Sequence, residues 1–438
     1  MGTAYWLYFR LYSHWININI FVNLIKNIVH GVYSVNIKLQ FKMSKICSVA
    51  GMIVGLCFSN CIISCDSSAN NQDDSRRERY TINPEVYTDG LKISQYSVDS
   101  ICSLNIPDGI VKMAVDKISV INGTFFILDN IISKKLYIFD YKGNLKTTIG
   151  ERGHARGEFI GKPDEFFVDS HNKLHVFDKI GHKIIVYNED GSVDDVVETN
   201  DLYPYSFGLT SNDKYIMYFG DGYRDKSNKK EKETRFSLLL FDKDYKNKKT
   251  MMLTSEKIHC FITSHTFFQD TDRVSFIPPF SDSVIVFKDD AIEKVVQFDF
   301  GGKNLIKEQP DALKQNKYPF MENYKGVLGI TRYQETASLV FLQYMYHDYP
   351  YYWLFDKRTG QSVNGLSIFE GISPYTYYHL DGNQIIAYVD DNVVELFKKY
   401  YHNKANKLQD GLKKSPVYMK DLMERRIKVP ALVYMTLK

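Results

Sequence analysis

Motifs that mark common enzyme classes are missing from this chain. It has no G-x-S-x-G turn, which presents the nucleophile of many hydrolases, and no H-E-x-x-H pattern, which would hold zinc. His171 and His175 are four residues apart, but they lie in a hairpin pattern, where such residues are not neighbours as in a helix. The sequence therefore predicts no catalytic residue and no metal ligand.

Cysteine is scarce, with six residues in a chain of 438. Four of the six lie within the first 65 residues, where the pair Cys57 and Cys61 falls in an apolar run and is not a metal site. Beyond them only Cys102 and Cys260 remain. Lone thiols in buried strands are the commoner arrangement, and whether these two pair stays open. A fold stapled by several disulfides is excluded.

An excess of basic residues is also absent once the first 64 residues are set aside. That segment contains five Lys and Arg residues and no acid, so the rest has 55 − 5 = 50 basic and 52 acidic residues, a net charge of −2. Nucleic-acid-binding proteins usually show a basic excess. No nucleic-acid partner is predicted.

The first 42 residues differ from the rest of the chain in composition. They contain no acidic side chain and hold two of the three tryptophans, Trp6 and Trp15. We interpret residues 1–42 as a non-native N-terminal extension, with Met43 as the biological start.

Residues 43–64 have the pattern of a signal peptide. Lys45 precedes the mostly apolar run Ile46–Ile63, and the run ends at a small residue followed by Cys65. The end of this run resembles a bacterial lipobox, which implies that Cys65 is lipidated after cleavage. An uncleaved membrane span is the alternative, since about 18 apolar residues lie at the lower limit for crossing a bilayer. Residues 65–90 are expected to form a flexible tether.

The clearest pattern in the chain is a repeated unit between residues 117 and 199. The first copy reads KISVINGTFFILDNIISKKLYIFDYKGNLKTTIG and the second EFFVDSHNKLHVFDKIGHKIIVYNEDGSVDDVVET. Both consist of short apolar runs separated by turn residues, such as Asn122-Gly123, which suits a two-residue hairpin turn. Asp129 and Asp178 end equivalent runs 49 residues apart, a period typical of β-propeller blades.

Residues 149–197, IGERGHARGEFIGKPDEFFVDSHNKLHVFDKIGHKIIVYNEDGSVDDVV, resemble an NHL-type propeller repeat. More closely, the chain is similar to the six-bladed β-propeller lipoproteins. The resemblance implies an all-β fold over residues 91–438, a six-bladed propeller of four-stranded antiparallel blades. It also implies an exported, membrane-anchored lipoprotein in the outer membrane, on its periplasmic or surface face.

The rest of the chain fits four further blades, beginning near Ser206, His265, Gly326 and Tyr375. Residues 393–428 change to a helical period and predict a helical insertion before the last strand. The strand-like run that follows is expected to close the ring together with the entering N-terminal segment, because a propeller joins its first and last blades.

Two groups of residues are candidates for binding a ligand. Arg152, His154 and Arg156, in the glycine-rich connector between the two copies, are expected to be exposed near one mouth of the channel. The aromatic residues Tyr346, Trp353 and Tyr377 belong to tyrosine-rich runs whose rings could stack on sugars. Packing between blades is the alternative for the aromatic residues, and ordinary solvation is the alternative for the connector.

These observations favour a non-catalytic binding module for a protein, peptide or glycan, anchored to the membrane by lipid alone and monomeric. No cofactor is predicted, and calcium or zinc has no support in the spacing of acids and histidines. The alternative is a propeller enzyme, a lyase or lactonase, with a metal or a histidine and acid site on the central axis. A propeller can gather such groups from separate blades, so spacing along the sequence does not exclude it.

Overall fold

The computed structural model describes residues 76–438, without 89, 108–112, 200–201, 224–234, 243–247, 255–264, 271, 305–323, 371–375, 406–416 and 425. Residues 73–438 form one compact unit. The predicted N-terminal extension, signal peptide and lipidated Cys65 lie outside the described residues, as does Cys260.

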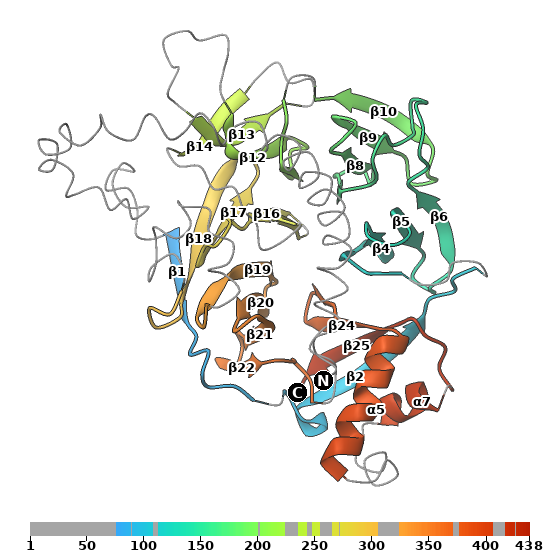
Figure 1. The fold of residues 1–438 in the computed structure, drawn as a ribbon, viewed down its shortest axis with the longest axis vertical. Helices are drawn as coiled ribbons and strands as arrows, with labels where there is room; N and C mark the ends of the chain where they lie inside the picture. Colours follow the sequence, from blue (N-terminus) through green and yellow to red (C-terminus); the bar gives the residue numbers. More distant parts are fainter. Residues whose placement is uncertain are drawn as a thin grey trace, which may run out of the picture. The chain divides into compact units, whose positions relative to one another are not determined.

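The described residues form six sheets arranged in a ring, which confirms the predicted six-bladed propeller (Figure 1). The first strands of the blades contact one another around the axis, and the later strands lie progressively further out. The strands of the first three blades, from the inside outwards, are β3 (Lys117–Ile121), β4 (Thr124–Asp129), β5 (Lys135–Phe139) and β6 (Leu145–Ile149); β7 (Glu165–Val168), β8 (Leu174–Asp178), β9 (Lys183–Tyr187) and β10 (Val193–Glu198); β11 (Ser206–Leu209), β12 (Tyr215–Tyr223), β13 (Arg235–Phe241) and β14 (Lys248–Thr254). Those of the last three are β15 (Phe267–Gln269), β16 (Arg273–Phe276), β17 (Ser283–Lys288) and β18 (Ala291–Asp299); β19 (Val327–Glu335), β20 (Leu339–Tyr346), β21 (Tyr349–Asp356) and β22 (Gln361–Gly365); β23 (Tyr378–Asp381), β24 (Gln384–Val389), β25 (Ala431–Leu437) and β2 (Tyr96–Ser103).

The hairpin turns of blades one and two follow the chemistry of their residues. Asn122 and Gly123 both have positive φ, 50° and 74°, as a two-residue turn of this type requires. In blade two Asn172, with φ 61°, occupies the equivalent turn, and its side-chain oxygen accepts a hydrogen bond from the Asn122 amide at 2.8 Å. The two copies seen in the sequence are therefore neighbouring blades in register.

Blade six closes the ring with strands from both ends of the unit. β2 pairs antiparallel with β25, with Cys102 opposite Leu432, and β25 pairs with β24. A short 3-10 helix, η3 (Ile93–Gln95), leads into β2. The predicted sharing of the last blade between the two ends is confirmed.

The predicted helical insertion contains two helices, α5 (Asp391–Ala405) and α7 (Val417–Met423), between β24 and β25. Val394 and Phe397 of α5 and Leu422 of α7 are buried in the same apolar cluster as Ala387 of β24. Helical spacing places these residues on the faces that pack on the blade. None of the described helices combines the length and apolar character needed to span a membrane.

The structure places a strand inside the segment expected to be a flexible tether, residues 65–90. β1 (Arg77–Thr81) pairs in parallel with β18, so blade four has five strands. Tyr80 packs on Phe298 and Trp353, with ring centroids 5.7 and 5.1 Å apart. The composition of the segment is polar, but residues 77–81 of it gain a strand partner in β18 and an aromatic contact through Tyr80.

Residues 82–91 continue from β1 along blade five to blade six. The Thr88 N–H donates to Asn364 O at 2.8 Å, and the Leu91 N–H donates to Ile368 O at 2.8 Å. We call the described residues between 77 and 91 the strap, because they run past the outer strands of blades four and five and reach blade six before β2 begins.

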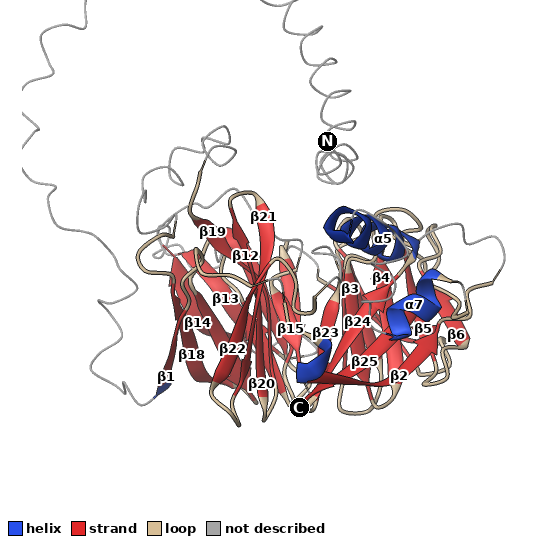
Figure 2. Ribbon diagram, turned by 90° about the horizontal axis from the view of Figure 1, so that it is seen from below, coloured by secondary structure: helices blue, strands red, loops and turns tan. Residues whose placement is uncertain are grey.

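The two faces of the ring differ in their connections. We define the upper face by the connections from the second to the third strand of each blade, which include α5 and α7, and the lower face by the other hairpin turns. Figure 2 shows α5 on the upper side and the C-terminus on the lower side. Each first strand runs from the upper face to the lower face, so the beginnings of β3 and β7 lie near the upper mouth of the channel.

Candidate functional site

A buried ionic cluster lies where the innermost strands begin. Asp116 and Lys117 come from blade one, Glu165 from blade two and His265 from blade four, and each is at most 6 % exposed. His265 Nδ1 is 2.8 Å from Glu165 Oε2, and its Nε2 is 2.8 Å from Asp116 Oδ2. We call these four residues the axial cluster. Because charges are costly to bury unless they are paired, the cluster joins three blades by compensating ions.

His265 is a cation in this arrangement. Burial alone lowers the pKa of His265, but Glu165 and Asp116 outweigh this effect and raise it to about 9. Both ring nitrogens donate to carboxylates, so neither points toward a substrate. A metal ion bound to either nitrogen would have to displace a carboxylate from it.

Lys117 supplies the second cation. Its Nζ lies 2.5 Å from Glu165 Oε1 and 4.1 Å from the centroid of the Phe167 ring. Burial raises the pKa of Glu165, but His265 and Lys117 lower it by more, so the pKa lies below its usual value. Glu165 is therefore a carboxylate that accepts from two cations.

Arg332 and Tyr377 lie beside this cluster on blades five and six. Arg332 Nη2 donates to Tyr378 O at 2.6 Å, and the guanidinium carbon lies 3.4 Å from the centroid of the Tyr377 ring. The Tyr377 hydroxyl donates to Ile118 O of blade one at 3.5 Å. These contacts continue the polar lining of the channel around the axis.

Amide and imidazole side chains also connect the inner strands, nearer to the lower face than the axial cluster. Gln269 of blade four pairs with both backbone groups of Val168 in blade two, at 3.0 and 2.5 Å. His379 Nε2 accepts from the Val120 N–H at 3.2 Å. Burial, with a smaller contribution from Arg332, lowers the pKa of His379 to about 3, so the ring is neutral. These side chains act as substitutes for strand pairing across the channel.

One set of acids and histidines within the described residues lies close enough to share a cation, and it is separate from the axial cluster: Asp169, His171 and Asp213, on the lower face. Asp169 already accepts from two backbone N–H groups and from His175 Nε2 at 3.1 Å. Asp213 accepts from Ser170 through its backbone N–H and its hydroxyl. These bonds make the carboxylates turn-stabilising groups.

The structure places the connector residues away from the channel. Arg152, His154 and Arg156 are exposed, as expected, but Arg156 Nη2 lies 3.3 Å from Asp195 Oδ1 on β10, the outermost strand of blade two. The connector is therefore on the outer rim, because it must pass from the outer edge of one blade to the inner edge of the next. A binding role for these residues stays a prediction.

The three aromatic candidates are placed in three different surroundings. Trp353 is buried between blades, stacked on Phe355 at 5.5 Å with 2° between the rings. Tyr377 lines the channel beside Arg332. Tyr346 ends β20 at the upper face, 5.2 Å from the ring of Tyr351. The structure does not bring them together into one site.

The axial cluster itself was not predicted from the sequence. One signal was present: Lys117 and Glu165 occupy the equivalent first position of the two repeat copies, immediately before apolar strand residues. A charge at the buried end of an inner strand needs a partner. His265 gives no such signal, since it lies 100 residues from Glu165.

Among the described residues, most of the exposed large apolar side chains lie on the upper face. They belong to the connections of that face, to the first residue of β21, to the strap beside the face or to α5: Val86, Tyr87, Ile132, Ile160, Ile180, Tyr203, Tyr349, Leu366 and Leu396. On the lower face, Tyr141 lies in a turn and Val193 begins β10. The described upper face therefore exposes more large apolar side chains than the lower face, although they are spread over several blades.

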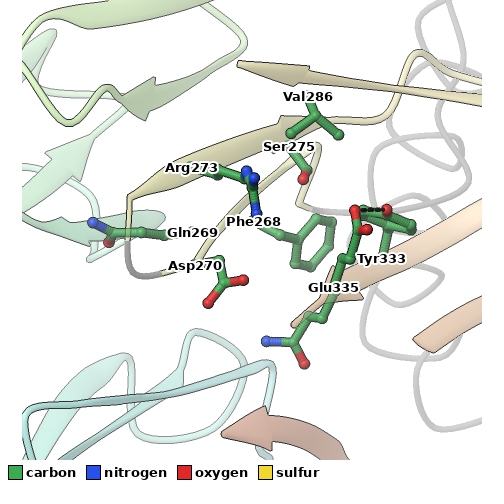
Figure 3. A pocket seen from close by; sticks show the side chains of 9 residues that line it. Phe268, Gln269, Asp270, Arg273, Ser275, Val286, Tyr333 and Glu335 are labelled. Carbon is green, nitrogen blue, oxygen red and sulfur yellow. Dashed lines mark hydrogen bonds between the residues drawn. The ribbon is translucent and has the colours of Figure 1, made fainter. Parts of the chain in front are cut away.

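A small pocket lies between blades four and five toward the lower face (Figure 3). Tyr333 and Glu335 of β19 face Phe268 and Arg273 across it, and the Tyr333 hydroxyl donates to Glu335 Oε2 at 2.6 Å. Lys294 Nζ, 2.7 Å from Glu335 Oε1, neutralises this carboxylate. The pocket is lined by groups that already have partners, and it gives no independent indication of a ligand.

Comparison with known proteins gives the family and the fold. A family described as "6-bladed beta-propeller" matches residues 74–412. A candidate exported protein from Bacteroides fragilis, 19 % identical, covers 83 % of this chain and 99 % of its own, with a TM-score of 0.61. Virginiamycin B lyase from Staphylococcus aureus is 10 % identical, covers 67 % of this chain and 82 % of its own, with a TM-score of 0.33. The extracellular domain of a candidate one-component system from B. thetaiotaomicron is 12 % identical, covers 68 % of this chain and 34 % of its own, with a TM-score of 0.34. Among curated proteins, none matches the sequence.

Proposed function

Because the chain belongs to the 6-bladed beta-propeller family, whose fold does not fix an activity, we propose from its sites that it is a non-catalytic binding module tethered to the cell envelope. Its partner is a protein, peptide or glycan bound on the upper face. The observation that carries this proposal is the separation of roles: the axial charges hold the blades together, and most of the large apolar side chains that the described residues expose lie on one face, where a partner can cover them.

The state of the axial histidines supports binding over catalysis. A general base needs a pKa near the working pH and an accepting nitrogen within reach of the substrate. His265 is held as a cation between two carboxylates, and the accepting Nε2 of His379 is already bonded to the Val120 N–H. Neither arrangement provides a proton acceptor for chemistry at neutral pH.

The tether is supported by the apolar run before Cys65 and by the start of the strap. Lipidation of Cys65 would leave 11 residues before Arg77, a reach of up to about 40 Å. β1 is parallel to β18, which rises from a lower-face turn, so the chain enters the propeller from the lower rim. The upper face then lies on the side away from the anchor.

Site-specific photo-crosslinking tests the proposal. A benzophenone amino acid at Ile180, on the upper face, is expected to give a discrete adduct in cells, and the same adduct in envelope fractions that are treated with EDTA before irradiation. The same group at Tyr141, on the lower face, is expected to give none. Equal labelling from both positions, or from neither, would contradict a partner on the upper face.

The enzyme alternative has one observation in its favour, since the axis does carry a histidine between two carboxylates. Elemental analysis of the purified protein separates the two functions. Stoichiometric calcium or zinc that is lost in an Asp116→Asn variant would favour a lyase or lactonase. Retained ligand binding in a His265→Gln variant that still folds would favour the binding module.

A further inference from the structure

Four tyrosines meet at the upper end of blade five, where the strap passes. Tyr346 and Tyr349 flank the turn between β20 and β21, Tyr351 follows, and Tyr87 comes from the strap. The ring centroid of Tyr351 lies 5.2 Å from that of Tyr346 and 6.0 Å from that of Tyr87, and both ring pairs are packed edge to face. We call these four residues the tyrosine platform.

The platform has two buried and two exposed rings. Tyr346 and Tyr351 are 6 % and 8 % exposed, whereas Tyr87 and Tyr349 are 56 % and 39 % exposed. Tyr87 packs edge to face on Tyr351, and Tyr349 lies opposite Tyr346 in the strand ladder, so the fold itself forms this surface before a ligand binds. This limits the entropy cost of binding.

The position of Tyr87 is fixed by the backbone of the strap. The Thr88 N–H donates to Asn364 O, and the Asn364 side-chain amide donates to Asn83 O and Val86 O at 3.1 and 3.0 Å. The segment that carries Tyr87 is therefore bonded on both sides of the ring to the outer strand of blade five. A loop held only by solvent would not present a ring in this way.

One ion pair lies close to the platform. Glu85 and Lys303 form an ion pair at its edge, with side chains 61 % and 37 % exposed. The phenol hydroxyls add donors and acceptors to the same surface. A ligand that matches it needs an apolar face for the rings and hydroxyl groups at its rim.

From this arrangement we infer that the tyrosine platform, with Glu85 and Lys303, is a carbohydrate-binding site. The C–H face of a sugar ring stacks on tyrosine, and its hydroxyls bond to a carboxylate and an ammonium group. The inference rests on the proposed binding function and names the ligand class. A stable protein interface buries about 1,200–2,000 Å² in total, whereas two exposed rings match the size of one or two sugar units.

Native affinity electrophoresis of the full-length protein in mild detergent tests the site. The probes are arabinoxylan, amylopectin and gastric mucin, each cast alone in the gel. We expect retarded migration in at least one gel, and at least a ten-fold weaker apparent affinity for a Tyr87→Ala/Tyr349→Ala double variant. A Tyr87→Phe variant is expected to keep most of the retardation, since stacking needs the ring and not the hydroxyl.

Two exposed tyrosines elsewhere provide matched controls. Tyr141, 67 % exposed, lies on the lower face, and Tyr203, 63 % exposed, lies on the upper face between blades two and three. Tyr141→Ala and Tyr203→Ala are expected to migrate like the unaltered protein. Circular dichroism of the double variant checks that it folds.

Three results would overturn the inference: no retardation by any probe, unchanged retardation of the double variant, or equal loss in the controls. If the probes fail while a crosslink from Ile180 still captures a protein, the binding function stands and only the carbohydrate assignment falls. If a crosslink from Tyr349 captures a protein and no probe retards the propeller, the platform is a protein-binding surface and the inference is wrong.

Discussion

His265 of blade four and Glu165 of blade two are joined directly across the inner end of blade three, with 2.8 Å between Nδ1 and Oε2. The bond spans a whole blade because the inner strands converge on the axis. Asp116, on the other side of the imidazole ring, brings blade one into the same contact. The ring of blades is thus held at its centre by charges as well as at its rim by the shared strands of blade six.

The first prediction concerns alkaline pH and His265. Its pKa is about 9 in the folded protein and near 6.5 in the unfolded chain, so the charged form stabilises the fold fully below pH 6.5. This contribution is lost as the pH rises through about 9. Relative to a His265→Gln variant, the free energy of unfolding should fall by on the order of 3 kcal/mol between pH 6 and pH 9.5. Denaturant titrations at both pH values measure this, and a constant difference would show that His265 is not charged in the fold.

His379 gives the opposite prediction at acid pH. Its pKa of about 3 in the folded protein means that the unfolded chain takes up a proton below pH 6.5 which the folded protein does not. Its contribution is present above pH 6.5 and is lost as the pH falls toward 3. Compared with a His379→Gln variant, the protein should lose on the order of 2 kcal/mol between pH 7 and pH 5. If the free energy of unfolding fell by the same amount in both proteins, the prediction that the buried His379 imidazole is neutral would be wrong.

The third prediction concerns the strap. Tyr80→Ala removes a ring that packs on Phe298, Trp353 and Phe355, and we expect it to destabilise the protein by about 2 kcal/mol. Thermal unfolding followed by tryptophan fluorescence measures the loss. Arg79→Ala, on the exposed side of β1, is the control and should change stability by no more than about 0.5 kcal/mol. An equal effect of both substitutions would mean that β1 contributes through its backbone alone.

The fourth prediction concerns the repeated aspartates. Asp178 accepts hydrogen bonds from the backbone N–H groups of Ile160, Gly161 and Gly181 at 2.7, 3.2 and 2.8 Å. Asp178→Ala leaves these donors without an acceptor, and we expect a loss of about 2–4 kcal/mol in the free energy of unfolding. Asp190, an exposed turn carboxylate that accepts from Ser192, is the matched control. A loss as small as that of Asp190→Ala would show that water replaces the carboxylate of Asp178.

Local patterns were enough to predict the architecture. Asn122-Gly123 and the equivalent aspartates Asp129 and Asp178 set the length of a blade, and the change to a helical period near residue 393 predicted the insertion. Each of these signals lies within one blade or one connection. They are readable because a strand or turn is determined largely by its own residues.

The site depends on contacts that no local pattern contains. His265 lies 149 residues from Asp116, and only closure of the ring brings them together. The tyrosine platform combines Tyr87 of the strap with Tyr351 of blade five, and the strap was itself expected to be flexible. The ring of Tyr346 is evident from the sequence, but its neighbours depend on the path of the strap, which no local pattern determines.

The path of the strap determines how the propeller would carry a mechanical load. A pull on the chain before Arg77 acts along β1, so its five residues and the facing residues of β18 are loaded in shear, with the hydrogen bonds of the ladder sharing the force. The seam between β2 and β25 lies two blades further along the chain and is loaded only after β1 detaches. When a partner pulls on a protein that is anchored at its N-terminal side, the force therefore acts on β1 first and leaves the ring of blades closed.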